Sequence, residues 1–288
     1  MNYPKSKIYF DGSHYIAIPH TRQLWKKRKN KIIKNVQEEK VKQILKNGEN
    51  KVKSEKIKNA VETITKEIND TQKATELVNK VLEKEKRNKI VRLTRLYRKV
   101  NLQQWTHFCT FTYDNEKLNE EEFKKKLLTC LRHLSNRKDW RYIGVWERSP
   151  TNNRLHFHGI FVIPEMIGNL IETKDYSTKT HQMQITHQNT FFLERFGRND
   201  FREIENNTVT LQAVKYMLKY IRKTNEKVIY SKHLHTYFVS DILESDIVCT
   251  IGQENRKLLL FDDFLCIDEG VVMGKVNPTV IKEMPKSN

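Results

Sequence analysis

The chain has 288 residues and a formal net charge of +18, with 53 Lys and Arg against 35 Asp and Glu. This length allows one sizeable domain with an additional region, and the charge favours a polyanionic partner, nucleic acid ahead of an anionic membrane. No apolar run reaches the roughly 18 residues of a membrane-spanning helix, and the N-terminus has no signal-peptide pattern. We therefore expect a cytoplasmic protein in a bacterial host cell with no membrane partner.

Two kinds of site are excluded by the residues that the chain lacks. The four cysteines, Cys109, Cys130, Cys249 and Cys266, are scattered without a close pair, which argues against a zinc ribbon or a disulfide scaffold. No GxxxxGK[ST] phosphate loop is present, so a built-in ATPase or helicase of that type is not expected.

The N-terminal part is basic and has helical periodicity. After a short predicted hairpin in residues 1–20, residues 22–99 hold 25 Lys and Arg against 10 Asp and Glu. Apolar residues recur at helical spacing, and breaks are expected at Asn47-Gly48 and at Asn69-Asp70-Thr71, where Asp70 or Thr71 would cap a helix. Residues 1–103 are thus predicted to be a mainly helical basic region. It would be either a solvated arm or an element that contacts DNA or oligomerises.

The pattern changes to alternating strands and helices after residue 104. An aromatic and β-branched strand is expected over 105–113, an amphipathic helix with Asn119 as its cap over 119–135, and two further strands over 140–147 and 154–163. This order predicts an α+β fold with a central antiparallel sheet and helices packed on one of its faces. We predict that this domain spans 104–245 and that 246–288 form a C-terminal extension.

The strand over 154–163 contains a His-Phe-His sequence inside an apolar run. Alternate side chains of a strand share one face, so His156 and His158 should project together while Phe157 points into a core. Glu147 ends the preceding strand, nine residues before His156, and a turn-rich segment lies between them. A hairpin would bring the carboxylate to the two imidazoles and create a divalent-metal site. A slip of one residue in its register would turn Glu147 to the opposite face.

A second group of polar side chains lies on the helix predicted over 208–223. Tyr216, Lys219, Tyr220 and Lys223 have i, i+3, i+4 and i+7 spacing, which places them on one helical face. A phenol is a poor nucleophile at neutral pH, because its pKa is about 10, and a nearby lysine or metal ion would favour the phenolate. Taken alone, this stripe equally describes an amphipathic helix with half-buried tyrosines and solvated lysines.

Together these residues resemble the HUH endonucleases, and in particular the replication initiator (Rep) proteins of rolling-circle plasmids and single-stranded DNA phages. The resemblance covers roughly residues 104–240. It rests on Glu147, on His156-Phe157-His158 and on Tyr216-x-x-Lys219-Tyr220, with residues 108–113 similar to the first motif of the family. It implies the HUH/Rep endonuclease fold.

The resemblance also implies a mechanism. Glu147, His156 and His158 would hold one Mg²⁺ or Mn²⁺ ion, and Tyr216 would attack a phosphate of single-stranded DNA. The products would be a 5′-phosphotyrosine and a free 3′-OH, and the strand could later be rejoined. Lys219 would position the phosphate or assist the phenolate. The expected DNA contacts are Arg148, Arg154, Lys215 and Lys223.

Tyr220 leaves the number of nucleophiles open. Two tyrosines at i and i+4 resemble initiators in which both act in successive cleavages, whereas in single-tyrosine initiators the second aromatic residue only packs.

The expected partners are a single-stranded origin, either linear or in a hairpin, a host helicase and a DNA polymerase, and a homo-oligomer is a further option. Two other functions fit the same residues. One is an HUH-type transposase; the other is a non-enzymatic basic regulator that binds DNA or RNA.

Overall fold

The computed structural model describes residues 2–20, 36–47, 52–149, 153–177, 181–205, 212–217, 227–251 and 257–287. It confirms the predicted α+β class with a central antiparallel sheet. No helix within these ranges is both long enough and apolar enough to cross a membrane.

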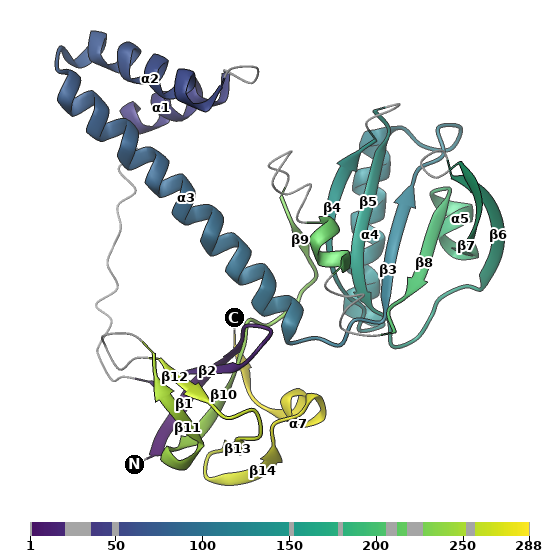
Figure 1. Cartoon of the computed structure of the whole chain (residues 1–288). Helices are drawn as coiled ribbons and strands as arrows, with labels where there is room; N and C mark the ends of the chain where they lie inside the picture. The colour runs from purple at the N-terminus through teal and green to yellow at the C-terminus, as the bar shows by residue number, and fades with distance from the viewer. Residues whose placement is uncertain are drawn as a thin grey trace.

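Three helices form a lobe at one end of the molecule (Figure 1). They are α1 (Val36–Asn47), α2 (Lys53–Ile68) and α3 (Thr71–Asn101). Both predicted breaks are confirmed. The first helix ends at Asn47, and between the other two Asn69 adopts a left-handed conformation while the Asp70 side chain accepts a hydrogen bond from the Lys73 N–H. Apolar side chains of all three helices, including Val41, Ile64 and Val78, make a small core of their own.

Helix α3 leads from this lobe to the rest of the chain. Its first half contributes to the core of the lobe and its last turns, with Leu96 and Val100, pack on the central sheet. Residues 86–92 between the two contacts are exposed. The helix therefore crosses solvent as a connector, as Figure 1 shows.

The central sheet has the strand order β8-β3-β5-β4-β9 among the described residues. Its strands are β3 (His107–Thr112), β4 (Arg141–Arg148), β5 (Leu155–Val162), β8 (Asn199–Glu203) and β9 (Ile229–Tyr230). Helix α4 (Glu120–Arg137) lies between β3 and β4 in the chain. As predicted, Asn119 caps this helix, in a reciprocal capping box with Glu122.

Helices pack on both faces of this sheet, so the prediction of helices on one face was wrong. On the first face, α4 and α5 (Thr190–Arg195) cover a core that includes Phe111, Phe157 and Phe161. On the second face, the end of α3 and the helical residues 212–217 pack on Ile143, Val145 and Ile160. Periodicity identified the helices, but the contact of the distant α3 with the sheet is a tertiary feature that has no local signature.

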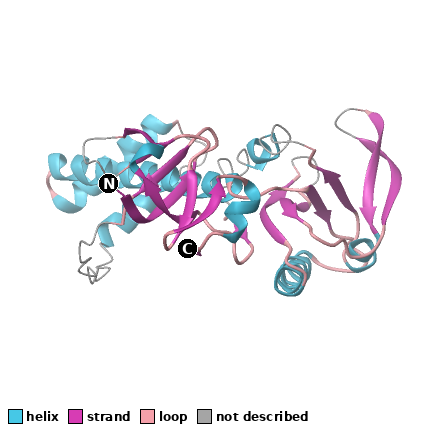
Figure 2. Cartoon of the chain, turned by 90° about the horizontal axis from the view of Figure 1, so that it is seen from below, coloured by secondary structure: helices cyan, strands magenta, loops and turns pink. Residues whose placement is uncertain are grey.

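Between β5 and α5 the chain forms a two-stranded ribbon of β6 (Leu170–Ser177) and β7 (Gln182–Asn189). It lies at the end of the molecule away from the helical lobe in both views (Figures 1 and 2). Sequence patterning had left this part of the chain without an assignment.

A second large sheet joins the two ends of the chain, with the order β11-β12-β2-β1-β10-β13-β14 and β15 paired to β10. Its N-terminal strands β1 (Asn2–Phe10) and β2 (Tyr15–Ile18) form the predicted hairpin. The others are β10 (Tyr237–Leu243), β11 (Ile247–Thr250), β12 (Leu258–Leu260), β13 (Leu265–Asp268), β14 (Val271–Lys275) and β15 (Lys286–Ser287), with the 3₁₀ turn Glu244–Asp246 and helix α7 (Pro278–Glu283) beside them.

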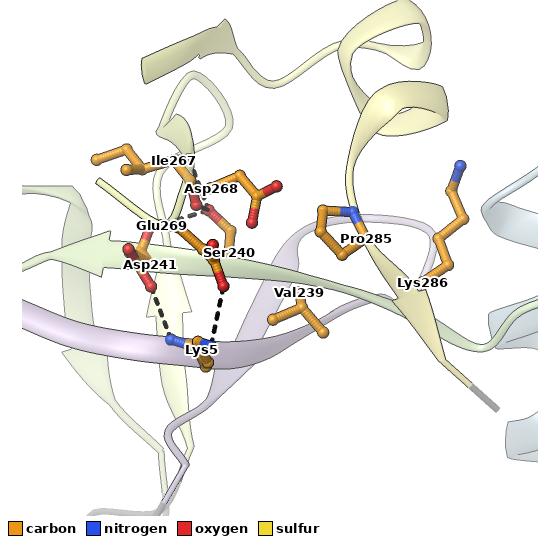
Figure 3. Close-up of a pocket in the computed structure, with 9 residues that line it drawn as sticks. All are labelled: Lys5, Val239, Ser240, Asp241, Ile267, Asp268, Glu269, Pro285 and Lys286. Atoms are coloured by element: carbon orange, nitrogen blue, oxygen red, sulfur yellow. Dashed lines mark hydrogen bonds and ion pairs between the residues drawn. The ribbon is translucent and has the colours of Figure 1, made fainter. Parts of the chain in front are cut away.

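This sheet takes strands from each of the three predicted regions, 1–103, 104–245 and 246–288. Figure 3 shows how the termini meet: the Asp241 carboxylate accepts hydrogen bonds from the Lys5 backbone N–H at 2.8 Å and from the Gly270 N–H at 3.2 Å. The Lys5 ammonium also lies 3.1 Å from Glu269 Oε1. These contacts line a recess of about 180 Å³ next to the bulge of β1. The domain limits stay a prediction.

Candidate active site

The β4–β5 hairpin has the register on which the predicted site depends. Glu147 pairs with His156, and Val145 pairs with His158. In this register Glu147, His156 and His158 all belong to the second face of the sheet, while Trp146 and Phe157 contribute to the core on the first face. The slip that would have turned the carboxylate away does not occur.

Glu147 and His158 contact each other directly. His158 Nε2 lies 2.7 Å from Glu147 Oε2, and the two residues are only 8% and 7% exposed. A buried carboxylate is costly unless it is paired, so the imidazole compensates for its loss of water. His156, which is partly exposed, lies beside them with its ring centroid 6.0 Å from that of His158.

Two threonines of β3 orient the histidine rings. Thr110 Oγ1 is 3.0 Å from His158 Nδ1, and Thr112 Oγ1 is 2.7 Å from His156 Nδ1. These are cross-strand neighbours, since Thr110 pairs with His158 and Thr112 with His156. With Nδ1 of each ring held by a hydroxyl, Nε2 is the nitrogen left for another contact, as in metal-binding histidines.

Electrostatics favour the neutral form of His156. Burial lowers its pKa to about 4, and the neighbouring His158 lowers it further, while Glu147 opposes the shift. Arg154 and Arg198 also lower the pKa of His156. An unprotonated imidazole at neutral pH has a lone pair to offer as a ligand.

Tyr216 reaches this group from the helical residues 212–217. Its hydroxyl donates a hydrogen bond to Glu147 Oε2 at 3.1 Å, and its ring packs edge-on against His158 with the centroids 5.3 Å apart. The ring of Phe108 lies 6.0 Å from that of Tyr216 and stacks on His158 at 6.2 Å. Tyr216 remains 36% exposed, so its phenol is accessible. Two motifs that are 58 residues apart in sequence, His158 and Tyr216, thus meet at one carboxylate.

The donor types suit a divalent cation, but the side chains are not gathered around one point. Among the described residues, no group of three or more His, Cys, Asp and Glu side chains is placed to hold a metal ion. Two imidazoles with hydroxyl-bound Nδ1 atoms and one carboxylate on the same face still fit such an ion chemically. The metal site remains a prediction.

The predicted DNA contacts differ in their surroundings. Arg148 pairs with Glu120, with Nη1 at 2.9 Å from Oε2, and Arg154 donates to the Tyr113 carbonyl and lies over the Tyr113 ring. Lys215 is exposed next to Tyr216. The predicted residues Lys219, Tyr220 and Lys223 lie outside the described residues.

Three contributors were not recognised in the sequence: Thr110, Thr112 and Arg198. The alternation of the strand over 105–113 contained a usable signal, because Phe108, Thr110 and Thr112 occupy the same face. Arg198 follows a glycine at the end of α5, and its Nη2 lies 2.9 Å from Asp175 Oδ2 in the ribbon. Nothing in its local sequence relates it to His156.

Comparison with known proteins agrees with the resemblance in part. Residues 106–225 match the family model of the replication-associated protein ORF2. This stretch runs from the start of β3 past Tyr216 and includes Glu147, His156 and His158. It is thus similar to replication-associated proteins. No curated protein and no solved structure matches the chain.

Proposed function

We propose that this protein is a replication initiator that nicks single-stranded origin DNA and later rejoins it. The observation that carries the proposal is the contact of the Tyr216 hydroxyl with Glu147, which in turn contacts His158. The match of residues 106–225 to a replication-associated family supports the biological role. The net charge of +18 supports a nucleic acid as the substrate.

The reaction is a transfer of one phosphodiester bond. The Tyr216 oxygen forms a bond to phosphorus, the bond from phosphorus to the 3′ oxygen breaks, and that oxygen takes up a proton to become a free 3′-OH. The 5′ end stays on the protein as a phosphotyrosine, so the bond energy is conserved and the reverse step rejoins the strand without ATP. The free 3′-OH can then prime a polymerase.

Each residue of the site has a task in this proposal. Glu147 Oε2 holds the phenol hydrogen of Tyr216 and so orients the phenol oxygen toward the histidines. His156 and His158, with Glu147, would hold Mg²⁺ or Mn²⁺, which when bound polarises the phosphate and neutralises its charge. Arg154, Arg198 and Lys215 supply cations near the path of the phosphate backbone. Lys219 would position the phosphate or assist the phenolate, and Tyr220 would either pack or act as a second nucleophile.

The decisive experiment is a covalent-capture assay. The protein is incubated with Mn²⁺ and single-stranded DNA from its own replicon, labelled on the 3′ side of the nick, and a denaturing gel reveals the adduct. We expect the adduct with the wild-type protein and its loss in Tyr216→Phe, His156→Ala and His158→Ala. Tyr176→Phe, which changes an exposed tyrosine of the β6–β7 ribbon, is the matched control and should keep the adduct.

Each other outcome has a definite meaning. Full capture by Tyr216→Phe would overturn the assignment of Tyr216, and loss of capture only in Tyr216→Phe/Tyr220→Phe would mean that both tyrosines act. Binding without an adduct on any single-stranded substrate in the presence of metal would indicate a non-enzymatic regulator. Cleavage confined to excision junctions would indicate a transposase.

A further inference from the structure

A groove lies on the first face of the central sheet, opposite the side that holds Tyr216 and Glu147. It runs between α4 and α5 and has a volume of about 860 Å³. The proposed nicking chemistry uses none of its residues. The covered face of the sheet separates the groove from the candidate active site, so a ligand in the groove would not contact the reacting atoms.

The floor of this groove is apolar. It contains Cys130 of α4, Ile167 before the ribbon, and Phe191 and Phe196 at the two ends of α5. Cys130, Ile167 and Phe191 are partly exposed although they pack against the main core. An opening onto the edge of a core of this kind accepts an apolar side chain from another molecule.

The rim of the groove is cationic. It carries Lys125, Lys126, Arg137, Lys138 and Arg195, against the single carboxylate of Glu122. Glu122 Oε1 lies 3.9 Å from the Lys126 ammonium, and Lys138 pairs at 2.8 Å with Glu165 outside the groove. Lys125, Arg137 and Arg195 make no ion pair within the described ranges of the chain. A partner that brings carboxylates would meet three uncompensated cations.

The aromatic ring in the floor argues against nucleic acid as the occupant. The Arg195 guanidinium already covers the Phe191 ring at 4.1 Å, and Phe192 contacts that ring edge-on at a centroid distance of 5.2 Å. Base stacking requires a free ring face, which Phe191 does not offer. A recessed apolar floor with separate cations on the rim is better matched by an acidic peptide with apolar side chains.

The length of the groove sets the size of such a peptide. Its α4 wall runs from Glu122 to Lys138, and at about 1.5 Å per helical residue this corresponds to roughly 24 Å. An amphipathic helix of about 15 residues would span it, with its apolar stripe on the floor and its carboxylates on the rim. We infer that this groove is a docking site for an acidic amphipathic segment of a partner protein.

The test uses the full-length protein and a fluorescein-labelled acidic helical peptide of about 15 residues with a Leu/Phe stripe. Binding is followed by fluorescence anisotropy. One control peptide has Lys in place of the acidic residues, and a second has Ser in place of the apolar ones. The variants are Lys125→Glu, Arg137→Glu and the double variant. Arg132→Glu, on α4 but outside the groove, is the matched control.

We expect the acidic amphipathic peptide to bind and both control peptides to fail. The Kd should rise about tenfold or more in the double variant and stay within about twofold in Arg132→Glu. Nicking and the affinity for oligo(dT) should be unchanged in the double variant, so the result is independent of the proposed nicking function. Equal peptide binding by the double variant, or no binding to the wild type, would overturn the inference. An equal loss of oligo(dT) binding would assign the groove to nucleic acid instead.

Discussion

The hydroxyl groups of Thr110 and Thr112 are the smallest features on which the candidate site depends. Each lies within hydrogen-bonding distance of the Nδ1 atom of one histidine, and each is fixed by the cross-strand pairing of β3 with β5. A histidine whose second nitrogen is held in this way presents one defined nitrogen to a ligand. The geometry of the site is therefore partly determined by residues that do not react.

We predict that Thr112→Val weakens Mn²⁺ binding roughly 10- to 100-fold, because valine has a similar shape but no oxygen for the Nδ1 atom of His156. Isothermal titration calorimetry on the protein without DNA measures this directly. Thr63→Val is the matched control, because the Thr63 hydroxyl bonds only to the Asn59 carbonyl within α2. Unchanged Mn²⁺ affinity in Thr112→Val would argue against His156 as a ligand.

At the scale of the element, the β4–β5 hairpin positions the site through close packing on its other face. Gly144 and Gly159 pair across the two strands, and the Phe157 ring occupies the space beside Gly144. A Cβ atom at Gly144 would lie 2.2 Å from Phe157 Cζ. The glycine thus allows a large ring into the core while His156 and His158, on either side of that ring in sequence, keep the site face.

We predict that Gly144→Ala lowers the free energy of unfolding by about 1–3 kcal/mol, since the Phe157 ring is fully buried and has little room to move. Chemical denaturation followed by tryptophan fluorescence gives the value. In the double variant Gly144→Ala/Phe157→Leu the smaller side chain should make room for the methyl group, so the two losses should be less than additive. Strict additivity would show that the ring does not limit this position.

The terminal sheet is the feature of the whole molecule that links its two ends. β1 pairs with β10 on one side and with β2 on the other, and β2 in turn pairs with β12. Its core combines Ile8 and Ala17 from the N-terminal strands with residues such as Phe238 and Leu258 from the C-terminal part. Neither end of the chain can bury these side chains without the other.

We predict that removal of residues 1–18 unfolds the C-terminal strands and leaves the central sheet intact. The deletion removes two adjacent strands from the middle of the terminal sheet and exposes unpaired edges on β10 and β12. Hydrogen exchange should show fast exchange at residues 258–268 and retained protection at β3 and β5. Retained protection at residues 258–268 would show that the C-terminal strands fold alone.

Local sequence was sufficient for the features that depend on periodicity and short-range chemistry. The helix breaks near Asn47 and Asn69, the cap at Asn119 and the common face of His156 and His158 all follow from spacing and side-chain type. The contact of Glu147 with His158 followed once a hairpin was assumed, because the turn-rich segment fixes the strands close together.

Only the tertiary structure decided how distant segments meet. The packing of α3 on the second face, the joining of β1 to β10, the approach of Tyr216 to Glu147 and the groove between α4 and α5 all bring together residues far apart in the chain. Such contacts are selected by the complementary burial of apolar surface across the whole fold. Periodicity within one segment shows which face is buried but carries no information about its partner.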